Sequence, residues 1–273
     1  MKKFFAIAAI AALLLACEEP ANNEEPNDKP STEQPGGNEN EGGNENEGGN
    51  ENEGGNENED PAYACLKGSD YYLIAMDGTT YETIKNKVVA DFRTDNYNTH
   101  LWIWEGTYVG DESAVGANYF GEAEGWIALK VVSGTTWSGA GICCYNPEAL
   151  AKLATITANP EEYVFHVALK GQDNTIQELV LDQDGVKAKA VIGYPGSGHE
   201  YSYERDGSWY EIEIPMTYFT ENGLLWTSSV GAGSTPGDNI TVIPVGGYNV
   251  LSILSGASGS IHLDACFIYK PAK

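Results

Sequence analysis

Several segments of the chain alternate strictly between apolar and polar side chains, which is the pattern of a half-buried β-strand. The clearest examples are WIALKVV, WYEIEIPM and SIHLDACFIYK. The predicted inward sets are Ile127, Leu129 and Val131 in the first, Tyr210, Ile212 and Ile214 in the second, and Ile261, Leu263, Ala265, Phe267 and Tyr269 in the third. A chain built from such segments is expected to fold as stacked β-sheets, because each strand has one face to bury.

The breaks between these segments are rich in Gly, Asn and Asp, which favour turns. A helix is predicted only at NPEALAKLA, where Asn146 is a suitable N-cap and Pro147 occupies the first helical position. Many short strands, frequent turns and one short helix predict an all-β fold. We expect an antiparallel β-sandwich of the jelly-roll kind.

The segment 18–60 contains no large apolar or aromatic side chain and includes four copies of GGNENE. Such a segment cannot offset the entropy cost of ordering, so it is expected to be a disordered acidic linker. The folded part is therefore predicted to be a single domain, residues 61–273.

The first 16 residues, MKKFFAIAAIAALLLA, have a basic start and an apolar run too short to span a membrane. They match a secretory signal peptide. The run ends in LLAC, which resembles the bacterial lipobox. That resemblance implies that Cys17 is lipidated, becomes the mature N-terminus and anchors the segment 17–60 to a membrane.

The formal charge of the whole chain is −25. The segment 18–60 contributes −14, from 15 acids and one lysine, and the signal peptide contributes +2. The remaining residues 61–273 therefore carry −13. This acidic balance argues against nucleic acid and anionic lipid surfaces as partners of the folded domain.

Four cysteines lie in the folded part: Cys65, Cys143, Cys144 and Cys266. Export permits disulfides, and four thiols allow three pairings, including a clasp between the first and the last. No Cys-x-x-Cys spacing or paired histidine supports a metal site. The sequence favours buried free thiols.

Residues 99–104 read THLWIW and pose a problem that periodicity does not solve. In a strand, Leu101 and Ile103 share one face, and Trp102 and Trp104 share the other. Both faces are apolar. Either the two tryptophans stay outside as part of a stacking surface, or at least one of them packs in the core.

The order of phrases from LWIWEGTY through EEYVFHVALKG and SWYEIEIPMTYF to IHLDACFIYK resembles β-jelly-roll carbohydrate-binding modules with a galactose-binding-like fold. Joined to the lipobox and the acidic linker, the whole resembles surface glycan-binding lipoproteins of Bacteroidetes polysaccharide-utilisation systems. The resemblance covers roughly residues 100–273. It implies a non-catalytic lipoprotein of the outer membrane, facing the cell surface. Such a protein captures polysaccharide or oligosaccharide for neighbouring glycan importers and enzymes.

Sugars present apolar C–H faces that stack on flat aromatic rings, so outward aromatics beside polar residues are the candidate ligand contacts. Trp126 shares its face with Lys130, and Trp209 shares its face with Glu211. For both, the alternative is an indole lying under a loop. The full candidate set is Trp102, Trp104, Tyr108, Trp126, Trp137, Trp209, Glu211 and Trp226.

The sequence leaves two alternative functions and one metal site to be considered. The rivals are a surface adhesin or structural lipoprotein, and a glycoside hydrolase that would use a carboxylate pair such as Glu211 and Glu213. The exposed setting of that pair disfavours catalysis, and we expect no enzyme activity. The jelly-roll resemblance also implies a structural calcium with Asp264 as a ligand; a solvent-facing Asp264 is the alternative.

Overall fold

The computed structural model describes residues 61–93, 99–123, 125–181, 188–227 and 248–273. Cys17, the predicted signal peptide and the predicted linker lie outside these residues. The described chain forms a β-sandwich of two sheets, called sheet A and sheet B below. Buried side chains of both sheets meet in one main core, for example Phe165 and Leu263 from sheet A with Ile142 and Ile253 from sheet B. The predicted all-β sandwich is confirmed.

Sheet A has seven strands in the order β11-β7-β13-β1-β2, with β5 also paired to β13 and β4 paired to β5. All pairs are antiparallel except β1 with β2. The strands of sheet A are β1 (Ser69–Ala75), β2 (Val88–Asp91), β4 (Tyr108–Gly110), β5 (Ile127–Val131), β7 (Val164–Lys170), β11 (Tyr210–Pro215) and β13 (Ser260–Lys270). Strand β13 organises the sheet, because it pairs with β7 on one side and with β5 and β1 on the other.

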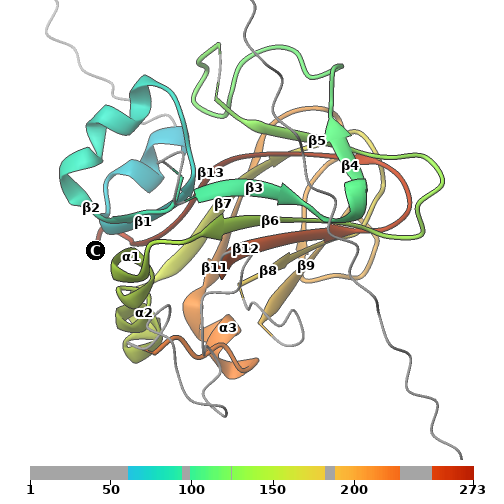
Figure 1. Ribbon diagram of the computed structural model, residues 1–273. Helices are drawn as coiled ribbons and strands as arrows, with labels where there is room; N and C mark the ends of the chain where they lie inside the picture. Colours follow the sequence, from blue (N-terminus) through green and yellow to red (C-terminus); the bar gives the residue numbers. More distant parts are fainter. Residues whose placement is uncertain (1–60, 94–98, 124, 182–187, 228–247) are drawn as a thin grey trace, which may run out of the picture. The chain divides into compact units, whose positions relative to one another are not determined.

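Sheet B has six strands in the order β10-β9-β8-β12-β6-β3, antiparallel except for β9 with β10. Figure 1 shows β3, β6, β12, β8 and β9 side by side in one layer, with β13, β7 and β5 in the other. The strands of sheet B are β3 (Thr99–Ile103), β6 (Ser138–Cys144), β8 (Gln177–Val180), β9 (Lys189–Gly193), β10 (Tyr201–Ser202) and β12 (Tyr248–Ser255).

The helices are all short. The predicted helix begins at Pro147, and its N-cap is Asn146, whose Oδ1 accepts from the backbone N–H groups of Glu148 and Ala149. The structure adds α3 directly after β11, and α3 contacts α2. The helices are η1 (Pro61–Leu66), η2 (Thr79–Thr83), η3 (Lys85–Lys87), η4 (Trp104–Gly106), α1 (Pro147–Ala151), α2 (Ala154–Ala158), η5 (Pro160–Glu162) and α3 (Met216–Glu221). No helix in the described ranges is long and apolar enough to cross a membrane.

The predicted alternation holds on β5 and β11. Leu129 and Val131 are buried in the main core, as are Ile212 and Ile214, whereas Glu211 between the strand's inward residues is exposed. Period-2 patterning therefore identified the inward faces of these two strands.

On β13 the predicted inward set is wrong beyond Leu263. A β-bulge interrupts the pairing with β7 between Asp264 and Phe267, and Ala265 takes a positive φ of 46°. The extra residue shifts the phase of the strand. Cys266 therefore faces the main core, and Phe267 turns to the opposite side. The alternation of apolar and polar residues does not indicate where a bulge occurs, so the sequence did not reveal it.

A second apolar cluster covers part of the outer face of sheet A. Tyr71 stacks on Tyr269 with ring centroids 5.5 Å apart and meets the edge of Phe267 at 5.4 Å. Cys65 of η1 and Phe120 of the loop 111–123 are buried in the same cluster. Part of the outer face of sheet A is thus covered by η1 and by this loop.

Cys65, Cys143, Cys144 and Cys266 are all buried thiols, and no disulfide joins them. This confirms the favoured prediction, and the clasp between the first and last cysteines is not formed. Burial raises the pKa of Cys143 to about 11, so its thiol stays protonated at neutral pH.

Candidate functional site

The partner strand of β3 decides which face of THLWIW is inside. Leu101 and Ile103 lie opposite Ile142 and Ala140 of β6, which belong to the main core. Trp102 lies opposite Gly141. Because paired residues of antiparallel strands project to the same side of a sheet, Trp102 projects from the outer face of sheet B. Its side chain is 48% exposed.

Trp104 and Trp137 meet over the glycines of β6. A Cβ placed on Gly139 would lie 2.4 Å from Cε3 of Trp104 and 2.6 Å from Cζ3 of Trp137. A Cβ on Gly141 would lie 3.2 Å from Cζ2 of Trp104. Both indoles therefore rest on bare strand backbone, which only glycine allows at this distance. We call Trp102, Trp104 and Trp137 the tryptophan shelf.

The turn after β3 holds Trp104 in this position. Glu105 and Gly106 both take positive φ, at 50° and 62°. The hydroxyl of Thr107 donates to the Trp104 carbonyl at 2.8 Å and accepts from the Gly139 N–H at 3.0 Å. This hydroxyl ties the turn to β6. A non-glycine residue such as Glu105 in the left-handed region is costly and persists only where the surroundings fix it.

An open groove of about 610 Å³ adjoins the shelf. It begins at Trp137 and crosses the ends of β12 and β8 to Tyr194, which follows β9. Strands about 4.8 Å apart place the β3 edge of the shelf roughly 19 Å from β9. The groove is lined by Trp137, Ser138, Asn174, Thr175, Ile176, Glu178, Tyr194, Leu254, Ser255, Gly256 and Ser258. An aromatic ring at each end and hydroxyl, amide and carboxylate groups between them make this an amphipathic surface.

Sequence reasoning missed most of the groove. Asn174, Glu178 and Tyr194 lie in segments that looked like ordinary turns and strands. The one available signal was the pair of glycines in WSGAGICC, because glycine inside a strand often marks a close approach.

Trp126 and Trp209 lie on sheet A and not on the shelf. Their rings meet edge to face at 6.2 Å, and Nζ of Lys170 lies 5.5 Å and 5.4 Å from the two centroids. Nε1 of Trp209 donates to the carbonyl of Ala117 in the covering loop at 2.9 Å. Trp209 therefore helps to hold the loop on sheet A. Both indoles are half-buried, and Trp126 lines the pocket that also contains Asp264, so their stacking on a ligand stays a prediction.

Glu211 belongs to the same covered surface. Its Oε2 accepts from the hydroxyl of Tyr119 at 2.8 Å and lies 3.5 Å from Nε2 of the fully buried His166. The contact with His166 lowers the pKa of Glu211, against the effect of burial. Burial disfavours protonation of His166, but its hydrogen bonds to Cys65 and Glu211 outweigh this and raise its pKa to about 10. Glu211 thus has structural partners, and because its side chain is still 41% exposed its contact with a ligand stays a prediction.

Tyr108 and Trp226 were predicted as ligand contacts, but both are 2% exposed. The 3-10 turn η4 changes the phase of the chain before β4, so Val109 is outside and Tyr108 is in the core. Trp226 packs in the same core, where its Nε1 donates to the hydroxyl of Tyr248 at 2.8 Å.

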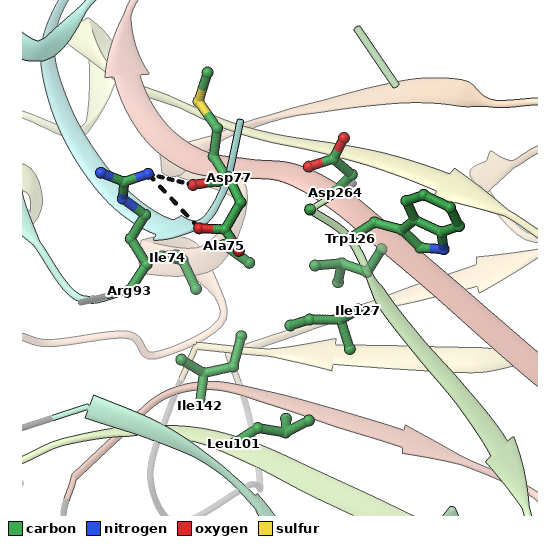
Figure 2. A pocket seen from close by; sticks show the side chains of 12 residues that line it. Ile74, Ala75, Asp77, Arg93, Leu101, Trp126, Ile127, Ile142 and Asp264 are labelled. Atoms are coloured by element: carbon green, nitrogen blue, oxygen red, sulfur yellow. Dashed lines mark hydrogen bonds and ion pairs between the residues drawn. The ribbon is translucent and has the colours of Figure 1, made fainter. Parts of the chain in front are cut away.

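Asp264 lines a pocket of about 230 Å³ that opens between the two sheets (Figure 2). Figure 2 shows its carboxylate between Asp77 and Trp126. The residue is 1% exposed; Oδ2 accepts from the N–H of Tyr119 at 2.8 Å, and Oδ1 has no hydrogen-bond partner. Burial raises the pKa of Asp264 to about 6, and the charges of Asp77 and Glu122 add to this.

These residues do not fit the calcium that the jelly-roll resemblance implied. Calcium takes six to eight oxygen ligands. Oε1 of the neighbouring Glu122 already accepts from Thr79 and Thr80. Within the part of the chain that the structure describes, no three acidic, His or Cys side chains gather to share a metal ion. Asp264 instead anchors the covering loop through Tyr119.

Comparisons with known proteins add little to this geometry. No family model and no curated protein matches the chain. One similar solved structure is described as the "Family 11 Carbohydrate-Binding Module of cellulosomal cellulase Lic26A-Cel5E of Clostridium thermocellum". It is 18% identical, with a TM-score of 0.33, and the match covers 67% of this chain and 93% of that one. A likeness at this level carries no functional argument, so the function must be argued from the outer face of sheet B.

Proposed function

We propose that the protein binds polysaccharide without cleaving it, on the outer face of sheet B. The observation that carries this proposal is the tryptophan shelf resting on the glycines of β6 beside an open polar groove. Partly exposed indoles offer flat apolar surface to the C–H faces of sugar rings. Groove residues such as Asn174 and Glu178 offer hydrogen-bond partners for the hydroxyl groups.

The fixed position of the shelf favours weak but specific capture. Trp104 and Trp137 are held against β6 before any ligand arrives, so binding costs little side-chain entropy. The hydroxyls of the groove are partly committed to each other: Oγ of Ser138 lies 2.8 Å from Oγ of Ser255. An open, hydrated surface of this kind binds by stacking and shape rather than by enclosure.

The carboxylates of the molecule support binding rather than hydrolysis. Glycoside hydrolases place two carboxyl groups about 5–9.5 Å apart across the scissile bond. Among the described residues that line the groove, Glu178 is the carboxylate, and it is paired with Lys189 at 2.7 Å. Glu211 and Glu213 lie outside the groove, on sheet A, where they accept from the hydroxyls of Tyr119 and Tyr269.

The proposal extends to where the domain works. Residues 1–16 would direct export, lipidated Cys17 would hold the chain in the outer membrane, and residues 17–60 would tether the domain at the cell surface. A flexible linker of this length spans about 35–40 Å on average. The tether would keep captured glycan at high local concentration near neighbouring importers and enzymes. Loss of fatty-acid labelling in Cys17→Ala, together with protease accessibility on whole cells, tests this part.

The binding proposal is tested by a glycan array with the purified full-length protein, followed by titration calorimetry on the glycans that bind. We expect binding to one or more polysaccharides with no release of reducing ends. Absence of binding to every polysaccharide would refute the proposal and leave the adhesin alternative in its place.

A further inference from the structure

We infer that the groove takes an uncharged polysaccharide and that the Glu178–Lys189 pair excludes acidic ones. This inference rests on the proposed function and names the class of ligand. Its basis is the placement of charge on the outer face of sheet B, which is distinct from the stacking argument above.

The pair presents its negative end to the groove. Glu178 of β8 is among the residues that line the groove, whereas Lys189 of the neighbouring β9 is not. Nζ of Lys189 lies 2.7 Å from Oε1 of Glu178, and both side chains are about one third exposed, at 36% and 31%. Nζ of Lys189 is therefore committed to Glu178, and of these two residues only Glu178 lines the groove.

Arg205 lies beside the groove and donates to the carbonyl of Thr175 at 2.8 Å, but it does not line the groove. No Lys or Arg occurs among the described residues that line the groove. The exposed Asp173, next to Asn174 of the groove, adds a further negative charge; its Oδ2 accepts from the N–H of Ser260 at 3.2 Å. Residues 61–273 as a whole carry −13. A uronate or sulfate group entering the groove would lose hydration beside Glu178, where the neighbouring cation, Lys189, is already paired with that carboxylate.

The hydroxyl groups of an uncharged sugar, unlike acidic groups, find hydrogen-bond partners in the groove. The carboxylate of Glu178 is held in place by Lys189, and its remaining lone pairs can accept from sugar hydroxyls. The hydroxyls of Ser255, Ser258 and Thr175 can both donate and accept. The groove therefore matches neutral, hydroxyl-rich sugars and repels their acidic counterparts.

Affinity electrophoresis with the full-length protein tests this inference. The first probes are a panel of uncharged and acidic polysaccharides. The uncharged polysaccharide that binds best is then tested in two derivatised forms, hydroxyethyl and carboxymethyl, with the same degree of substitution on the sugar hydroxyls. The hydroxyethyl form controls for bulk. We expect the carboxymethyl form to bind about tenfold more weakly, with the difference shrinking as salt rises from about 0.02 to about 0.5 M.

Glu178→Gln frees Lys189 and should recover most of the binding to the carboxymethyl form. Glu221→Gln, at the end of α3, is the matched control. It should leave the ratio of the affinities for the hydroxyethyl and carboxymethyl forms unchanged. Preferred binding of acidic polysaccharides, equal loss with both derivatives, or an unchanged ratio in Glu178→Gln would overturn the inference while the proposed function stands. Failure of every polysaccharide to bind would instead remove the proposed function and this inference with it.

Discussion

Truncation of Trp137 to alanine should weaken glycan binding by about 30-fold. The residue is 39% exposed, so roughly 100 Å² of an indole of about 250 Å² remains accessible to a ligand. If a sugar ring covers about half of that area, burial at about 25 cal/mol per Å² contributes about 1.2 kcal/mol. Stacking geometry adds about 0.5–1.5 kcal/mol. The sum, about 2 kcal/mol, corresponds to the stated change in Kd.

Titration calorimetry on the best-bound polysaccharide measures this change. The covered part of the Trp137 ring packs on Gly139, so the truncation also lowers the free energy of unfolding, and binding must be measured well below the melting temperature of the variant. Trp126→Phe on sheet A is the control and should leave Kd unchanged. A change of less than about twofold in Kd for a folded Trp137→Ala would refute the stacking argument.

Three further predictions concern the packing that supports the site. Gly139→Val places carbon atoms where the rings of Trp104 and Trp137 lie, so it should displace the shelf and abolish binding while circular dichroism still reports a β-sandwich; retained binding would contradict the placement of the two rings. The pKa of Asp264 is raised from 3.8 to about 6, so between these two pH values the folded state holds a proton that the unfolded state has lost. The free energy of unfolding should therefore fall as pH rises from about 4 to about 6, by up to about 3 kcal/mol. Denaturant melts measure this slope, and Asp264→Asn should flatten it. The four buried thiols should react with Ellman's reagent only in denaturant, and rapid labelling of the native protein would contradict their burial.

Local sequence patterns identified where the strands and the first helix lie. They identified which side chains face the core on some strands but not on others. The inward faces of β5 and β11 and the N-cap Asn146 were predictable, because each depends on residues adjacent in sequence. The exchange of faces on β13 beyond Leu263 was not, since a bulge depends on how β13 pairs with β7. The fold class survived this error because the strands themselves were correctly placed.

The candidate site, too, was predictable in part from the sequence. Trp102, Trp104 and Trp137 were among the predicted contacts, but only the glycines of β6 show that they form one surface. Trp126 and Trp209 looked outward because charged residues share their faces. Lys130 is indeed exposed, but Glu211 and the neighbouring Lys170 contact the loop 111–123, through Tyr119 and the carbonyl of Val115. Contacts across 90 or more residues cannot be read from a local period.

The most direct test compares two sets of tryptophans on the two faces of the sandwich. One variant carries Trp102→Ala, Trp104→Ala and Trp137→Ala, and the other carries Trp126→Phe and Trp209→Phe; both are run beside wild type in affinity gels containing the best-bound polysaccharide. We predict that the first variant migrates as if no polysaccharide were present and that the second is retarded like wild type. Wild-type retardation of a folded first variant, or loss of retardation in the second alone, would contradict the assignment of binding to the outer face of sheet B.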